Sequence, residues 1–478
     1  MIIIPILLAL FTWILILWLC EQYKHINIFE QIALWFVSAL SLFVFELFLQ
    51  WIIFDKLSLL LPILSFVICL WLFIFKCIKK RWYRKEIADS IKWNFIDMKN
   101  QFKSQKHWQK ILVCFFCVYA LAKCFMAFSI NLHMPTFDED AVVWRDLKTK
   151  VYTENRGLVL DKSSPEYLWS AYERNFFAPL TDSYFLLAND EIKINQTDII
   201  SSIIYLLSVI VLFGILLRKW NLFFASLSSY IFTSIPFIFI HWFGSYFNFI
   251  SWVLLFIFIF YLIDQLLESN KNILIPISLL WFLTTTIRNE SFILIIAIVL
   301  MTLIFYYILN KKDKKELKIK FKYIWYILIP LILWIISIKY MSSLNPDWTS
   351  LNIWTIWLEN SNWWTISIFF NNLFNEWLIK YFLQQWFYHT DYNLIFLILI
   401  LTIIYCILRK IEIKQYILHL ISFIILLWWT FAILVYNYEN LWLITHYWFI
   451  RFSTVYIVFL VFIVVYMMYL LYNDFLEK

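Results

Sequence analysis

The feature that most constrains this chain is a succession of apolar runs, each of about the length that crosses a bilayer. The run 197–217 (TDIISSIIYLLSVIVLFGILL) is one example, and comparable runs recur along the 478 residues. A backbone in lipid must satisfy its own hydrogen bonds, and the sequence lacks the period-two alternation of a membrane barrel. We therefore predict an all-α polytopic membrane protein, in keeping with the hydrophobic fraction of 63%.

Apolar length and flanking charge predict thirteen transmembrane helices. The first run has neither a basic start nor a small-residue cleavage site, so we interpret it as a retained helix rather than a signal peptide. The predicted helices lie near residues 1–20, 32–50, 57–75, 111–132, 197–217, 222–241, 247–263, 272–287, 291–309, 322–340, 393–408, 416–436 and 453–472.

Basic residues predict the orientation of these helices. Segment 76–110 carries eleven Lys and Arg residues, and segment 311–322 carries seven. By alternation the two segments share one side, which holds 26 of the 39 basic residues and should therefore be cytoplasmic. The N-terminus is then outside, and the net charge of +7 reflects membrane topology rather than nucleic-acid binding.

Several functional classes are disfavoured by what the sequence lacks. The chain holds only three glycines, which excludes nucleotide loops built on glycine. It has no internal repeat, which disfavours the common transporter architectures. Cys114 and Cys117 have CxxC spacing but lie in an apolar run, so we interpret them as small buried hydrophobic residues. The seven histidines are scattered and predict no metal cluster.

Two predicted external loops, 133–196 and 341–392, are too long to be simple connectors. In the first loop, three consecutive acids at 138–140 open a short amphipathic helix, which would lie flat and hold a carboxylate cluster at the membrane surface. In the second loop, the amphipathic stretch 371–386 would also lie along the membrane. The apolar stripe of the first helix consists of Val143, Trp144, Leu147 and Val151.

These acids also have a purely structural interpretation. Thr136 followed by Glu139 forms a capping box, and the helix dipole favours acids in a first turn. On sequence chemistry alone, the structural and the functional interpretation both stand.

Further ionisable groups lie at or within the predicted membrane helices. Arg288-Asn289-Glu290 occupies a short turn between two apolar runs, and ionisable groups at membrane depth are candidates for function. Arg451 opens the last predicted helix from the outside, where an arginine is more often an interfacial anchor than a ligand. Lys123 lies inside the fourth predicted helix, and the sequence assigns it no role.

Six segments with a common external placement occur in one order within about residues 111–472. They are Phe137-Asp138-Glu139, 144–150 (WRDLKTK), 177–180 (FAPL), 236–248 (PFIFIHWFGSYFN), 286–290 (TIRNE) and 448–453 (WFIRFS). In this order they resemble the motifs of the GT-C glycosyltransferases, polytopic enzymes that use sugars carried on polyprenyl phosphates.

The sequence departs from the family pattern at Asn248, where many members have Asp, and at Ser291, where they have Gly. Three helices precede the acidic loop instead of one, so residues 1–110 are an addition of N-terminal helices and a basic cytoplasmic loop. By resemblance, residues 111–472 form the GT-C-like catalytic module, and 473–478 form a cytoplasmic tail.

The resemblance implies an inverting transfer of sugar from a polyprenyl-phosphate carrier to an acceptor hydroxyl on the extracytoplasmic face. Asp138 would be the base, Glu139 would assist it or orient the acceptor, and Asp140 is the spare acid. Cationic groups would stabilise the departing prenyl phosphate. The candidates for that role are, in falling order, Arg288, Arg451 and Lys150, and those for substrate binding are Glu290, His241 and Tyr246.

Such a reaction requires no cofactor, and a divalent cation is optional. The partners implied are a polyprenyl-phosphate sugar donor, a glycan, lipid or protein acceptor, and membrane lipid, without nucleic acid. The expected location is a bacterial plasma membrane, with the site facing the periplasm or the exterior.

Three other classes stay open. A lipid or glycan flippase or a transporter would place charged residues near the midplane, whereas these acids gather at one face of the membrane. A polysaccharide polymerase or ligase would rely on external arginines and histidines rather than on a leading pair of acids. A structural scaffold without catalytic activity is the third.

Overall fold

The computed structural model describes residues 3–19, 26–80, 82–133, 145–159, 161, 163–166, 177–188, 198–236, 238–239, 395–409, 420–427 and 446–476, with short stretches between 257 and 380. Within this part of the chain every regular element is helical. The longer helices are α1 Ile3–Leu19, α2 Ile28–Phe54, α3 Leu60–Lys79, α4 Tyr83–Ser104, α5 His107–His133, α7 Leu147–Glu154, α9 Phe177–Leu186, α10 Asp198–Lys219, α11 Leu222–Ser234, α21 Ile395–Arg409 and α23 His446–Leu476.

Apolar helices of membrane-crossing length confirm the prediction of an all-α membrane protein. Five are long and apolar enough to cross a bilayer: Ile28–Phe54, Leu60–Lys79, His107–His133, Asp198–Lys219 and Ile457–Phe475. Three shorter apolar helices, Ile4–Ile16, Leu222–Ser234 and Ile395–Arg409, also coincide with predicted spans. The other five predicted spans, 247–263, 272–287, 291–309, 322–340 and 416–436, lie mostly or wholly outside the described residues.

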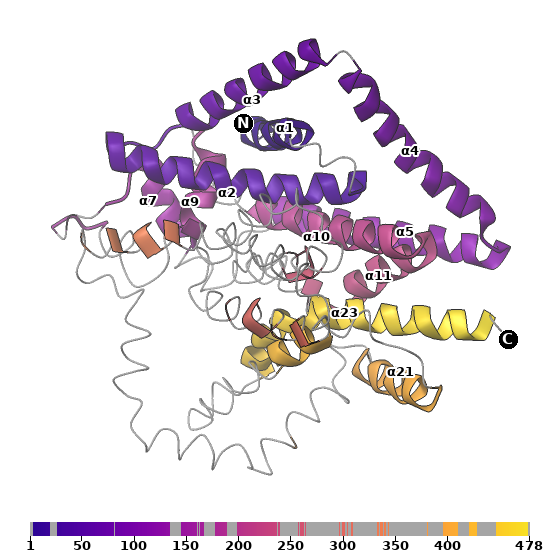
Figure 1. The fold of residues 1–478 in the computed structure, drawn as a ribbon. Helices are drawn as coiled ribbons and strands as arrows, with labels where there is room; N and C mark the ends of the chain where they lie inside the picture. The colour runs from indigo at the N-terminus through magenta and orange to yellow at the C-terminus, as the bar shows by residue number, and fades with distance from the viewer. Residues whose placement is uncertain are drawn as a thin grey trace.

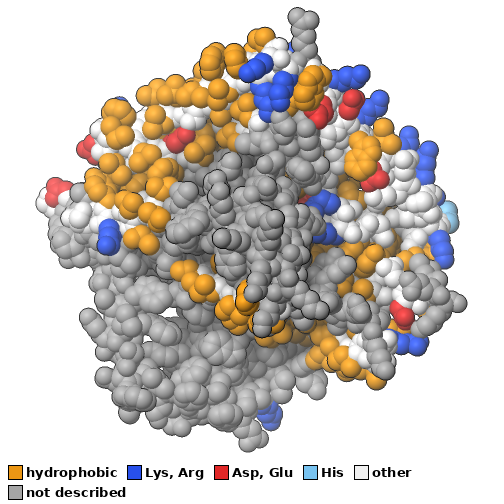
Figure 2. Space-filling view, in the orientation of Figure 1, with side chains coloured by type: hydrophobic (Ala, Val, Ile, Leu, Met, Phe, Trp, Pro, Cys, Tyr) orange, Lys and Arg blue, Asp and Glu red, His pale blue; other side chains and the backbone are white. Residues whose placement is uncertain are grey.

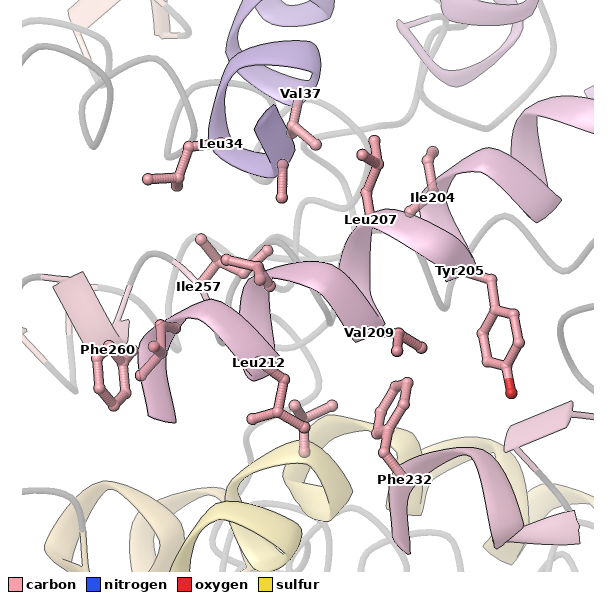
Figure 3. Close-up of a cluster of buried hydrophobic side chains, with 14 of the residues drawn as sticks. Leu34, Val37, Ile204, Tyr205, Leu207, Val209, Leu212, Phe232, Ile257 and Phe260 are labelled. Carbon is pink, nitrogen blue, oxygen red and sulfur yellow. The ribbon is translucent and has the colours of Figure 1, made fainter. Parts of the chain in front are cut away.

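The central helix of the described bundle is α10, because fifteen of its 22 residues are buried. It packs against α2, α5 and α11. Figure 3 shows Leu34 and Val37 of α2 above α10, and Phe232 of α11 below it. At Gly214 of α10 the approach to α2 is so close that an added Cβ would lie 2.9 Å from the backbone nitrogen of Glu30.

The two ends of α10 define two ends of the bundle, here called the Asp198 end and the Arg218 end. At the Arg218 end, Arg218 Nε donates to Glu30 Oε2 at 2.9 Å, and the Tyr261 hydroxyl donates to Glu30 Oε1 at 2.7 Å. Asn27 caps α2 there and donates to the Gly214 carbonyl oxygen. Helix ends that were predicted to share the cytoplasmic side therefore lie together.

The C-terminal helix α23 also has one end beside the Arg218 end of α10 (Figure 1). Trp220, which follows α10 directly, stacks on Tyr469 of α23 with ring centroids 5.1 Å apart. Gln109 near the start of α5 donates to the Tyr472 hydroxyl at 2.9 Å, and Tyr405 of α21 donates to Asp474 at 2.8 Å. The C-terminal end of α23 thus lies at the Arg218 end.

The N-terminal helices share one hydrophobic core with the rest of the described bundle. Residues of α2 and α10 belong to the same buried cluster, and α1 packs on α2 and α3. By contrast, α3 carries large exposed apolar side chains along its length, including Val67, Trp71 and Phe75. Figure 2 shows this apolar surface at the upper left, and it is the kind of surface that lipid covers.

Candidate functional site

Four buried charged residues meet at the Asp198 end, and together they are called the Arg145 cluster: Arg145, Asp146, Asp182 and Asp198. Arg145 Nη2 donates to Asp198 Oδ1 at 2.7 Å, and its Nε donates to Asp146 Oδ1 at 2.7 Å. Asp182 Oδ2 lies 3.3 Å from Arg145 Nε. One guanidinium therefore joins the chain just before α7, the middle of α9 and the first residue of α10.

The charge balance of the Arg145 cluster depends on burial. Burial lowers the pKa of Arg145, but the three carboxylates outweigh this effect and raise the pKa above its usual value. Burial raises the pKa of Asp182 to about 8, opposed by Arg145 and reinforced by Asp146 and Asp198. Among the described residues, Asp182 Oδ2 accepts no hydrogen bond. Burial therefore favours the uncharged form of Asp182, while Arg145 pairs most closely with Asp146 and Asp198.

Asp198 also fixes both ends of the segment that carries the predicted acidic motif. Asn131 on the last turn of α5 donates to the Asp198 carbonyl oxygen and to the Ser202 hydroxyl, both at 2.9 Å. Arg145 pairs with the Asp198 carboxylate. The chain thus enters residues 134–144 and leaves them beside the same residue of α10. Asp138, Glu139 and Asp140 themselves lie outside the described residues.

The helix that follows this segment differs from the prediction. A flat amphipathic surface helix was expected, but five of the eight residues of α7 are buried, including Lys148. The reason is tertiary packing, because α9 lies against α7 and Thr149 Oγ1 donates to the Pro179 carbonyl oxygen at 3.3 Å. The described part of the predicted first external loop is thus a packed structure rather than a helix resting on the bilayer.

Lys150, a predicted phosphate ligand, lies on the exposed side of α7. Its ammonium is 3.8 Å from Glu154 Oε1, and both side chains are about half exposed at 47% and 51%. Lys150 is therefore separated from the buried Arg145 cluster and accessible from the solvent side. This exposure leaves it available to a ligand, although the structure brings no other predicted site residue next to it among those described.

Arg451 lies near the start of α23, and only its backbone is described. At 1.5 Å per residue it is about 35 Å along the helix from Asp474, slightly more than the thickness of a hydrocarbon core. Because Asp474 lies at the Arg218 end, this places Arg451 toward the opposite boundary. Arg288, Glu290, His241 and Tyr246 lie outside the described residues, so their predicted roles stay predictions.

Asp182 and Asp198 were not predicted as site residues. Asp198 is the second residue of the apolar run 197–217, and Asp182 follows the FAPL segment by two residues, so each resembled an ordinary boundary residue. A signal was present, because Arg145 and Asp182 lie in the predicted loop 133–196 and Asp198 lies at the start of the helix that follows it. Among the described residues no group of three His, Cys, Asp or Glu side chains could hold a metal, and the carboxylates here surround a guanidinium.

Among the described residues, Glu46 and Lys123 are charged side chains that lie in the interior of membrane-length helices, away from the first and last turns. Glu46 of α2 is largely buried and accepts a hydrogen bond from the Ser65 hydroxyl of α3. Lys123 of α5 lies over the Phe239 ring, with its ammonium 4.4 Å from the ring centroid. No protein-family model, curated protein or solved structure matches the chain. Function must therefore be argued from these residues and their arrangement.

Proposed function

We propose that this protein is a membrane glycosyltransferase that moves a sugar from a polyprenyl-phosphate carrier to an acceptor hydroxyl. The observation that carries the proposal is the closure of segment 134–144 on Asp198. Three consecutive acids occupy a segment whose two ends are fixed by buried polar contacts at one end of a membrane bundle. A fixed carboxylate at that boundary is where a base must lie if the donor lipid is in the bilayer and its sugar projects outward.

The residues then have distinct roles in the proposed reaction. Asp138 takes the proton of the acceptor hydroxyl as its oxygen attacks the anomeric carbon, and the bond to the prenyl phosphate breaks with inversion. Arg451 and Arg288 stabilise the negative charge that develops on the leaving phosphate. The Arg145 cluster does not touch the substrate in this scheme. It positions the acidic segment.

The proposal extends to the architecture and the location. It includes thirteen transmembrane helices in a GT-C-like arrangement, with the Asp198 end facing the exterior of a bacterial plasma membrane. Support for this orientation comes from α4, which is rich in basic residues and contacts the Arg218 end through Gln101 and Leu222. Basic residues are enriched on the cytoplasmic side of membrane proteins.

The test is sugar transfer by the purified full-length protein in lipid, with a panel of radiolabelled polyprenyl-phosphate sugars. Wild type is compared with Asp138→Asn and with Asp161→Asn, an exposed acid of the same loop whose carboxylate accepts hydrogen bonds from Ser163. We expect label to leave the carrier with wild type and Asp161→Asn, and to stay on it with Asp138→Asn. Transfer that survives Asp138→Asn would move the base to Glu139 or Asp140, and no transfer from any carrier would reject the enzyme.

A flippase or transporter is the second candidate, favoured by Glu46 and Lys123. Ionisable groups inside membrane helices commonly mark a substrate or ion pathway. This class predicts movement of an intact labelled carrier lipid across vesicles, without transfer of its sugar. It also predicts that Glu46→Gln abolishes the movement, whereas the glycosyltransferase proposal expects transfer to survive that substitution.

A further inference from the structure

Helix α4 joins the end of α3 to the start of α5, so these two helix ends lie on the same side of the membrane. It begins four residues after the end of α3 and ends three residues before the start of α5. Helix α5 is about 40 Å long, which matches a bilayer with its headgroups rather than the hydrocarbon core alone. The end of α4 beside α5 therefore lies at headgroup level, and Figure 1 shows α4 running obliquely from there to the end of α3, along the outside of the bundle.

The inner face of α4 is attached to the protein by a narrow set of contacts. Tyr83 and Ile87 are buried, and Phe102 packs partly buried against the main core. Gln101 Oε1 accepts from the Leu222 backbone nitrogen at 2.9 Å. These contacts fix which side of α4 faces outward.

The outward side of α4 carries a line of lysines. Lys85, Lys92 and Lys99 are exposed and occur at intervals of seven residues, which places them on one stripe of a helix. Of the three acids on α4, Asp89 is exposed beside Lys85 and Lys92, whereas Glu86 and Asp97 are half-buried and Asp97 accepts from Gln101 at 2.7 Å. The exposed charge of this face is therefore predominantly positive, as the blue side chains along the upper right edge of Figure 2 indicate.

Large apolar side chains lie beside these lysines. Trp82 is 53% exposed, Trp93 64%, Phe95 50% and Ile96 44%, so none of them is covered by the protein. A helix that carries lysines and exposed aromatic side chains is typical of a helix at a membrane interface. The exposed Ile78 at the end of the apolar helix α3 continues this surface toward the lipid.

We infer that the outward face of α4 binds anionic phospholipid headgroups of the membrane in which the protein is embedded. Lys85, Lys92 and Lys99 contact the phosphates, and Trp93 with Phe95 enters the interfacial layer between headgroups. Charge complementarity and the attachment of α4 to the headgroup-level start of α5 favour lipid over an acidic protein partner. This inference is independent of the proposed sugar transfer.

The test measures lipid binding to the full-length protein in mild detergent, by native mass spectrometry with phosphatidylglycerol or phosphatidylcholine. We expect wild type to prefer phosphatidylglycerol, and Lys85→Gln/Lys92→Gln/Lys99→Gln to bind it about a hundredfold more weakly at low salt, because each lysine near an anionic surface contributes about fivefold. The matched triple Arg variant should retain the preference. Salt at about 0.5 M should weaken wild-type binding, because screening shortens the reach of the charges.

Single substitutions keep the test decisive if the triple variant does not fold. Lys92→Gln should weaken phosphatidylglycerol binding about fivefold, whereas Lys56→Gln, which removes an exposed lysine between α2 and α3, should not change it. Equal binding of phosphatidylglycerol by wild type and the Gln variants would overturn the inference. The inference would also be overturned if a Gln variant no longer bound an acidic soluble protein that wild type binds, while its lipid preference stayed unchanged.

Discussion

Arg145 joins the described segments of the predicted loop 133–196 to α10, so we expect the structure of that loop to depend on it. Its guanidinium is buried and pairs with Asp146 and Asp198 at 2.7 Å, so removal of its charge deprives two buried carboxylates of their cation. We predict that Arg145→Met destabilises the protein by about 3 kcal/mol or more. Arg145→Lys should cost less but should not be neutral, because an ammonium cannot replace the planar fork.

The measurement is thermal unfolding of the purified full-length variants in one detergent. Lys150→Met on the same helix is the control, because Lys150 is exposed and its ion pair with Glu154 contributes little. An unfolding midpoint for Arg145→Met equal to that of Lys150→Met would mean that the Arg145 cluster does not stabilise the loop.

Asp182 predicts a specific dependence of stability on pH. Its pKa is raised from 3.8 to about 8 in the folded protein, so between these values unfolding releases a proton. The contribution of Asp182 is fully present below about pH 4 and is lost as pH rises to about 8, with a slope of at most about 1.4 kcal/mol per pH unit. Asp182→Asn should remove that slope. The free energy of unfolding of the variant, relative to that of wild type, should therefore rise with pH. Parallel profiles from pH 5 to 9 would contradict the prediction.

At the scale of elements, the contact between α2 and α10 depends on the absence of a side chain at Gly214. A Cβ there would meet the backbone nitrogen and the side chain of Glu30 at 2.9 Å, and a helix backbone cannot move aside cheaply. We predict that Gly214→Ala destabilises the protein by about 1–3 kcal/mol, despite the better helix propensity of Ala. The matched control is Gly157→Ala, since its nearest neighbour would be Trp51 at an ordinary 3.6 Å. Equal unfolding midpoints for the two variants would reject this account.

The sequence predicted the membrane helices better than it predicted the loop between them. The predicted span 197–217 and the observed α10 agree within a few residues, because apolar run length alone decides where a helix can cross a bilayer. The prediction for α7 was wrong because a stripe of apolar residues says nothing about what covers the polar side. Lys148 and Asp182 are buried through contacts between α7, α9 and α10, and such contacts depend on segments distant in the chain.

At the scale of the whole molecule, two sets of contacts support helices that cross the bundle in alternating directions. Asn27, Glu30 and Arg218 meet at one end of the bundle, and Asn131, Arg145 and Asp198 meet at the other. Since α10 spans Asp198–Lys219 in 22 residues, the two sets are separated by about 30 Å, the thickness of a hydrocarbon core. The contacts establish which helix ends share a side, but the side that faces the cytoplasm follows only from the distribution of basic residues.

That orientation gives the last prediction. If the Asp198 end faces the exterior, Lys150→Cys on α7 should react with a membrane-impermeant maleimide in intact cells, because the side chain at this position is exposed. Lys99→Cys on α4 is also exposed but lies at the Arg218 end, so it should react only after the membrane is permeabilised. Wild type measures the background from the natural cysteines. Labelling of Lys99→Cys but not Lys150→Cys in intact cells would show that the orientation is the reverse of the predicted one. The three acids of segment 134–144 would then lie on the cytoplasmic side, where a site for an outward-facing sugar cannot be.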